Sequence, residues 1–182
     1  MPQVDTQQAA SLPGSLQVPG DTGRTDQYLT FQLAGEMFAI GILAIREIIE
    51  YASLTTVPMM PTYVRGVINL RGSVVPVLDL SVRFGKAPSA VTKRTCIVIV
   101  EITLHGERRV FGVVVDSVNA VLDIPSSEIE PAPSFGARIR TDFIQGMGRV
   151  NDRFVVLLDV THVLAAEEIA LLGESMHAGR AA

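Results

Sequence analysis

The side chains best suited to chemistry in this sequence are three histidines and one cysteine, and they are scattered along the chain. His105 lies where a turn is expected, and His162 and His177 lie near the C-terminus. Cys96 lies within an apolar run and has no evident base. Nucleophilic and metal sites need several such groups in a defined arrangement. Since a phosphate-binding Gly-Lys-Ser/Thr loop is also missing, we expect no enzymatic activity, no metal and no cofactor.

Two charged residues, Glu47 and Arg71, point to recognition when the chain is aligned with itself. Residues 38–49 align without a gap on residues 111–122, an offset of 111 − 38 = 73. Residues 63–80 align on residues 143–160, an offset of 143 − 63 = 80. Such self-similarity indicates a duplicated structural unit.

The second copy lacks both charges. Glu47 aligns with Ala120, and Arg71 aligns with Asn151. Asn151 and Asp152 form an ordinary turn pair, so a hairpin here does not require an arginine. The joint absence indicates that Glu47 and Arg71 act as a pair, and because exposed ion pairs stabilise a fold little, recognition is the better explanation. The alternative is that they are two unrelated solvated charges.

The elements that must position these charges are predicted to be β-strands. Short alternating apolar runs dominate, and two repeated sets of short antiparallel strands predict an all-β protein with two small barrels. Asp79 and Asp159 each end a strand and are expected to cap the helical turn that follows. The predicted strands cover residues 28–33, 37–42, 46–51, 66–71, 73–79, 95–103, 109–115, 118–123, 143–150 and 153–159.

Composition restricts the partners and the location. The chain has 182 residues, of which 48% are hydrophobic and 19% charged, so it can bury a substantial core. A net charge of −4 and the absence of tryptophan argue against nucleic acid as a partner. The longest apolar run is much shorter than the roughly 18 residues of a membrane span, so we expect no membrane insertion. A single cysteine is typical of a reducing, cytoplasmic location.

Three motifs carry a family resemblance. The stretches "VRGVINLRGSVVPVLDL" (64–80), "FGVVVDSVNAVL" (111–122) and "PAPSF" (131–135) occur in this order. Together they resemble the bacterial chemotaxis coupling protein family CheW. The resemblance implies two five-stranded SH3-like β-barrels and a non-enzymatic adaptor that joins methyl-accepting chemoreceptors to the histidine kinase CheA. The apolar stripe that precedes Gly173 separately predicts a C-terminal helix. An alternative is the same scaffold in a non-motility chemosensory system with another kinase and receptor set.

The chain divides accordingly. Its first residues are rich in Gln, Ser, Pro and Gly, which predicts a disordered leader, and its last residues predict a frayed tail. The expected boundaries are 1–25 for the leader, 26–172 for the CheW-like domain, 26–90 and 91–160 for its barrel elements, 160–172 for the helix and 173–182 for the tail.

The resemblance also implies a receptor site and the location of the protein. In the family, a groove between the barrels takes the helical tip of the receptor, and the motif arginine pairs with a glutamate. The protein would be cytoplasmic and recruited to membrane-associated receptor arrays. Gly66 is expected to allow close approach of backbone in the groove. The positions carried over to this chain are Ile45, Glu47, Gly66, Val67, Asn69, Leu70 and Arg71.

A separate kinase contact is expected at Phe135. This aromatic residue lies in the seven residues that the second copy has in excess, and it is flanked by Pro131, Pro133, Ser134 and Gly136. Exposed aromatic side chains on stiff loops are typical interface anchors. The alternative is that Phe135 packs onto its own barrel. The resemblance favours contact with the CheW-like regulatory domain of CheA.

Overall fold

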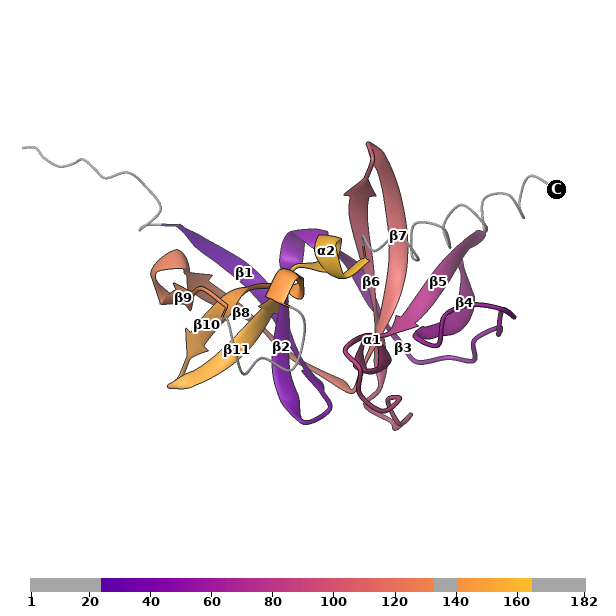
Figure 1. Ribbon diagram of the computed structural model, residues 1–182, viewed down its shortest axis with the longest axis horizontal. Helices are drawn as coiled ribbons and strands as arrows, with labels where there is room; N and C mark the ends of the chain where they lie inside the picture. Colours follow the sequence, from indigo (N-terminus) through magenta and orange to yellow (C-terminus); the bar gives the residue numbers. More distant parts are fainter. Residues whose placement is uncertain (1–23, 133–140, 165–182) are drawn as a thin grey trace, which may run out of the picture.

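The computed structural model describes residues 24–132 and 141–164, which form two β-barrels side by side (Figure 1). Both are SH3-like subdomains, as the family resemblance implies. We call them barrel A and barrel B. Within the described residues, all ten predicted strands are present and one further short strand occurs in barrel A.

Barrel A contains the first and last strands of the chain. Its sheet has the order β8-β1-β2-β11-β10-β9, and β11 and β2 are its only parallel neighbours among the pairs described. The β9 strand is a two-residue addition to the five strands expected. The strands are β1 (Thr25–Leu33), β2 (Glu36–Gly41), β8 (Ser117–Pro125), β9 (Ile129–Glu130), β10 (Ile144–Val150) and β11 (Arg153–Leu158).

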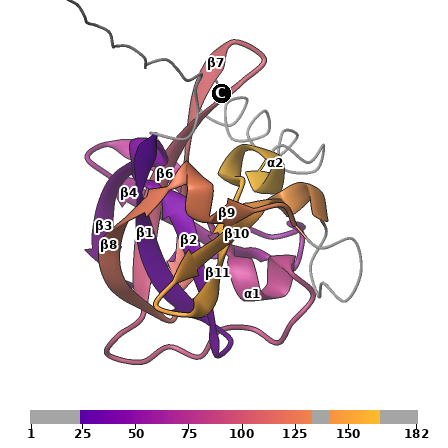
Figure 2. The ribbon, with the colours of Figure 1, turned by 90° about the vertical axis from the view of Figure 1, so that its left-hand side faces the viewer.

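Barrel B has five strands, as expected, in the order β3-β6-β7-β5-β4. Its strands are β3 (Ile45–Glu50), β4 (Val64–Leu70), β5 (Ser73–Asp79), β6 (Cys96–Leu104) and β7 (Glu107–Val115). The β6–β7 hairpin projects beyond the body of the molecule (Figure 2). The helical segments of the described chain are short: η4 (Ile42–Ala44), α1 (Leu80–Arg83), η5 (Ser126–Glu128), η6 (Thr141–Phe143) and α2 (Val160–Leu164).

The sheets do not follow the division into residues 26–90 and 91–160 that the repeat suggested. Barrel A combines β1 and β2 from the first copy with strands of the second, and barrel B takes β6 and β7 from the second copy. Each copy has therefore exchanged its first hairpin with the other. Strand periodicity cannot reveal such an exchange, because it shows which residues face a core and not which strand lies alongside.

The duplication is nevertheless present in the topology. Reading β8-β1-β2-β11-β10 against β3-β6-β7-β5-β4, every strand of one barrel has a counterpart in the other. Leu29 faces Ile40 in the first hairpin, and Val98 faces Val113 in its counterpart. The offsets are 98 − 29 = 69 for β1 and β6 and 113 − 40 = 73 for β2 and β7, the latter as in the sequence alignment.

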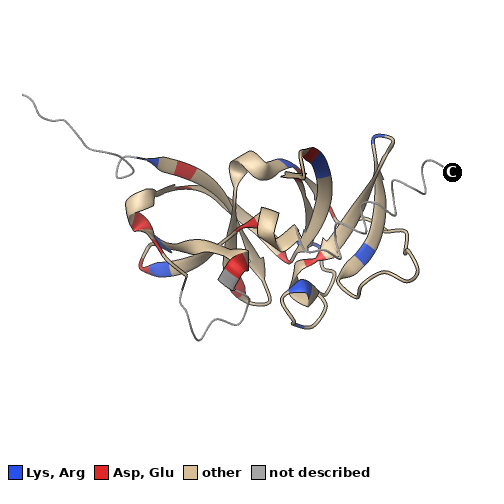
Figure 3. Cartoon of the chain, turned by 45° about the horizontal axis from the view of Figure 1, so that its top comes forward, with Lys and Arg blue, Asp and Glu red and all other residues tan. Residues whose placement is uncertain are grey.

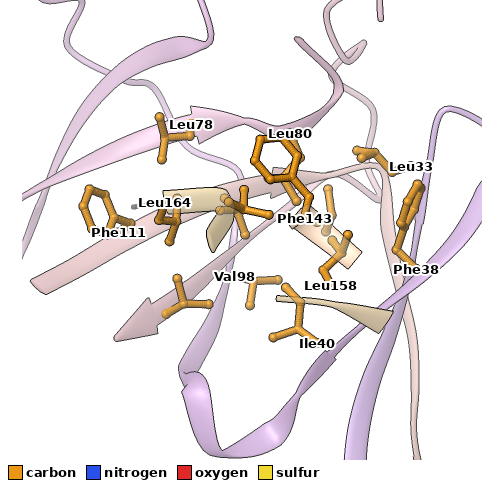
Figure 4. Close-up of a cluster of buried hydrophobic side chains, with 14 of the residues drawn as sticks. Leu33, Phe38, Ile40, Leu78, Leu80, Val98, Phe111, Phe143, Leu158 and Leu164 are labelled. Carbon is orange, nitrogen blue, oxygen red and sulfur yellow. The ribbon is translucent and has the colours of Figure 1, made fainter. Parts of the chain in front are cut away.

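The main hydrophobic core lies between the two barrels (Figure 4). Leu33, Phe38 and Ile40 enter it from barrel A, while Val98 and Phe111 enter from barrel B. These five side chains are all almost completely buried. Burial of a large apolar side chain stabilises a fold by about 1.5–3 kcal/mol, so this shared layer holds the barrels together.

Both strand-ending aspartates cap the helical turns that follow, as predicted. The backbone N–H of Ser81 donates to Asp79 Oδ1 at 3.0 Å, and the backbone N–H of His162 donates to Asp159 Oδ1 at 3.0 Å. The expected C-terminal helix begins at Val160 and is described as far as Leu164. Its expected remainder, the tail and most of the expected leader lie outside the described residues.

Basic and acidic residues are interspersed over both barrels (Figure 3). Within residues 24–132 and 141–164, no group of three or more His, Cys, Asp or Glu side chains is arranged to hold a metal ion. No helix of this part of the chain is both long enough and apolar enough to cross a membrane.

Candidate partner-binding site

The hairpin between β4 and β5 ends in a two-residue turn, Arg71-Gly72. Their φ angles are 52° and 86°, and Asn69 Oδ1 accepts a hydrogen bond from the Gly72 N–H at 2.8 Å. Tight hairpins favour positive φ at both turn positions, and Asn, Asp or Gly adopts it most readily. The counterpart turn follows this preference with Asn151 and Asp152. Arg71 therefore occupies a position where an arginine is conformationally unfavourable.

Arg71 forms a two-pronged ion pair with Glu47. Its Nη1 and Nη2 lie 2.5 Å and 2.8 Å from the two carboxylate oxygens of Glu47. This confirms the pairing that the repeat predicted. Glu47 lies on β3 and Arg71 follows β4, and these are the two outer strands of the barrel B sheet. The ion pair therefore connects the two edges of that sheet at the molecular surface.

The electrostatic effects of the pair are mutual. The hydrogen bonds that Arg71 donates to Glu47 lower the pKa of Glu47 below its ordinary value. The same hydrogen bonds raise the pKa of Arg71. The Arg71 side chain is 71% exposed and that of Glu47 26% exposed. Solvent screens such a pair, so its contribution to stability is small. Fixing the direction of a guanidinium at the surface is the more important consequence.

We expect the Glu47 carboxyl to titrate below the ordinary glutamate pKa of about 4.3. Because the folded pKa is the lower one, the pair's stabilisation is present above the unfolded pKa and is lost as the pH falls through the folded value. Side-chain carboxyl NMR of the intact protein measures the midpoint. In Arg71→Gln the midpoint should return toward 4.3. Equal midpoints in both proteins would contradict the pairing in solution.

Gly66 has a structural role that the sequence did not reveal. It is buried with a φ of 151°, and a Cβ at this position would lie 2.5 Å from the backbone oxygen of Thr55. Next to it, Val67 and Thr55 exchange backbone hydrogen bonds of 2.8 Å and 3.0 Å. A Cβ at its counterpart Gly146 would also be crowded, 2.7 Å from the Ile129 side chain and 3.0 Å from the Glu130 backbone oxygen. The backbone that approaches Gly66 closely is therefore the chain's own.

The other expected groove residues also lie on β3 and on the β4–β5 hairpin, where their surroundings differ. Ile45 packs against the core between the barrels, whereas Leu70 packs against the interior cluster of barrel B. Val67 is half-buried and Asn69 is exposed. The structure thus gathers all seven residues on β3 and the β4–β5 hairpin. Phe135 lies outside the described residues.

Sequence analysis did not identify Arg65, which lies on β4 near the start of this hairpin. Its Nε donates to the buried Asp79 at 3.1 Å, its Nη1 donates to the Tyr51 hydroxyl at 3.0 Å, and its Nη2 donates to the Ser89 backbone oxygen. These contacts fix the connection between β5 and β6. The one available signal was the position of Arg65 immediately before Gly66 in the repeated segment.

Comparison with known proteins gives consistent results. The family model described as CheW-like domain matches residues 27–168. The chain is 35% identical to Chemotaxis protein CheW of Klebsiella aerogenes, over 80% of this chain and 86% of that protein. It is 32% identical to Chemotaxis protein CheW of Rhizobium meliloti, over 78% and 89%.

A solved structure is similar as well. The scaffolding protein TtCheW from Thermoanaerobacter tengcongensis matches with a TM-score of 0.71 and 28% identity. The match covers 84% of this chain and 96% of that one. The similarity therefore extends over both barrels.

Proposed function

The chain belongs to the CheW-like family of chemotaxis adaptors, and we propose that it couples methyl-accepting chemoreceptors to the histidine kinase CheA. In this proposal it acts in the cytoplasm at membrane-associated receptor arrays. It supplies binding surfaces and no catalytic group.

The observation that supports the proposal most is the ion pair of Arg71 and Glu47. An arginine at positive φ is conformationally costly, and the counterpart turn avoids that cost with Asn151. The exposed pair contributes little stability in return. Partner recognition explains why an oriented guanidinium is kept at this turn.

The surroundings of the pair fit a helical partner. Ile48 is 42% exposed on β3 and Val74 is 43% exposed on β5. An amphipathic helix binds through its apolar face while its polar rim meets charges. We propose that the tip of the receptor hairpin lies over this region, with Arg71 and Glu47 fixing its orientation.

The kinase would bind elsewhere on the adaptor. We propose that Phe135 anchors the CheW-like regulatory domain of CheA, barrel against barrel. The proposal therefore expects both partners to bind at once. The adaptor then transmits a signal only if its contacts differ between the two signalling states of the array.

Simultaneous binding tests the proposal directly. A labelled receptor signalling fragment is titrated with this protein, first alone and then with the kinase regulatory domain at saturation. We expect both partners to bind and the receptor affinity to be retained in the presence of the kinase domain. Binding of neither partner by the folded protein, or mutually exclusive binding, would contradict it.

A further inference from the structure

Barrel A contains an open hollow that the described part of the chain leaves empty. It has a volume of about 460 Å³ and lies where β1, η4, β10 and the start of α2 meet. Its walls include the polar side chains of Arg24, Asp26, Gln145, Asp159 and Thr161. The hollow is on the opposite barrel from the ion pair of Arg71 and Glu47.

The equivalent place in barrel B is filled by the chain itself. The connection after α1 turns back, and the Ser89 backbone N–H and hydroxyl donate to Asp79 at 3.0 Å and 3.1 Å. Arg65 donates to the Ser89 backbone oxygen, and the Ser81 hydroxyl donates to the Ala87 backbone oxygen at 2.6 Å. Asp79 is 1% exposed as a result.

Thr95 completes these contacts, since its hydroxyl donates to the Ala90 backbone oxygen at 3.2 Å. Four side chains of barrel B therefore bind one extended segment, residues 87–90. They contact four of its backbone polar groups and its serine hydroxyl.

All four of these side chains have counterparts in the walls of the hollow. The offset of 80 relates Asp79 to Asp159, Ser81 to Thr161, and Arg65 to Gln145. The offset of 69 relates Thr95 to Asp26, since 95 − 69 = 26. Arg65 and Gln145 also occupy equivalent register shifts, between Val64 and Gly66 in one barrel and between Ile144 and Gly146 in the other.

We propose that the hollow of barrel A is a second segment-binding site, which takes an extended Ser- or Thr-containing segment of a partner protein. Asp159 accepts the segment's N–H and hydroxyl, as Asp79 does in barrel B, and the segment takes the place of the His162 ring, whose Nδ1 lies 2.7 Å from Asp159 Oδ2. Gln145 and Thr161 donate to its backbone oxygens. Asp26, the counterpart of Thr95, is paired with Arg24, whose Nε lies 3.1 Å from Asp26 Oδ2, so its charge is already balanced within the wall of the hollow.

A partner segment fits better than the chain's own terminus. Residues 167–170, which match the bound segment of barrel B at an offset of 80, read Glu-Glu-Ile-Ala and contain no hydroxyl. The segment bound in barrel B instead contains Ser89.

The barrel B segment itself provides the probe. A synthetic peptide of residues 85–92, Gly-Lys-Ala-Pro-Ser-Ala-Val-Thr, is added to the full-length ¹⁵N-labelled protein at millimolar concentration. We expect amide shifts at Gln27, Gln145 and Thr161, with those at Arg71 unchanged. A peptide with Ala in place of Ser should bind about tenfold more weakly, because it loses a hydrogen bond to a charged acceptor.

Variants locate the site. Thr161→Val keeps the side-chain shape and Gln145→Met keeps its length, and each should weaken peptide binding several-fold without changing the melting temperature. Asp159 is avoided because it caps α2. Absence of shifts at these walls, or equal binding of the Ser and Ala peptides, would overturn the proposal. Nuclear Overhauser contacts from residues 165–182 to the walls in the peptide-free protein would identify the terminus as the occupant and overturn it too.

Discussion

Gly66→Ala should lower the free energy of unfolding by about 2–4 kcal/mol. The added Cβ would lie 2.5 Å from the Thr55 backbone oxygen, so the backbone must shift, and the φ of 151° is unfavourable for any L side chain. Urea denaturation of both proteins measures the difference. Gly66→Asp should be at least as damaging, so a loss of receptor coupling in that variant would follow from misfolding.

Gly72→Ala is the matched control. Gly72 also has a positive φ, of 86°, but a Cβ there would meet nothing within 4 Å. Only the conformational penalty remains, which is about 1–2 kcal/mol. Equal losses of unfolding free energy in the two variants would show that the contact with Thr55 contributes nothing. Partner binding would then be the better explanation for Gly66.

Arg71→Glu should weaken receptor binding more than about tenfold and leave the melting temperature nearly unchanged. The substitution removes the oriented guanidinium that we propose meets the receptor and puts a second carboxylate next to that of Glu47. Like charges at an interface are costly. Stability changes little because the Arg71 side chain is largely exposed and glutamate meets the same φ penalty. Receptor-fragment titration and thermal denaturation measure the two effects.

Arg149→Glu is the control for this variant. Arg149 is likewise an exposed arginine in an ion pair, 2.9 Å from Glu130, but it lies on barrel A. Its reversal should leave receptor binding intact. A large loss of melting temperature in Arg71→Glu would show that Arg71 is structural, and an equal loss of binding in both variants would indicate a general effect of charge.

The sequence predicted the duplicated fold and the key ion pair for the same reason. Residues repeated in both copies, such as Gly66 and Gly146, serve the barrel in each. Residues present in one copy, such as Glu47 and Arg71, are free to serve a partner. The distinction required only an internal alignment, because each copy is a comparison for the other.

Tertiary contacts explain what could not be predicted. The exchange of first hairpins depends on which strands meet in space, and the periodicity of apolar residues does not show this. The crowding of Gly66 comes from Thr55, which precedes it by eleven positions, 66 − 55 = 11, in an irregular segment. The connection containing Ser89 has no repeat pattern, so its docking onto Asp79 became visible only in three dimensions.

Reconstitution of kinase control tests the central claim most directly. Receptor signalling fragments and CheA are combined with increasing amounts of this protein, and kinase autophosphorylation is measured. The account predicts that the wild type and Arg149→Glu make the kinase responsive to the receptor, while folded Arg71→Glu does not. If folded Arg71→Glu supports the same response as the wild type, coupling through the ion pair of Arg71 and Glu47 is contradicted.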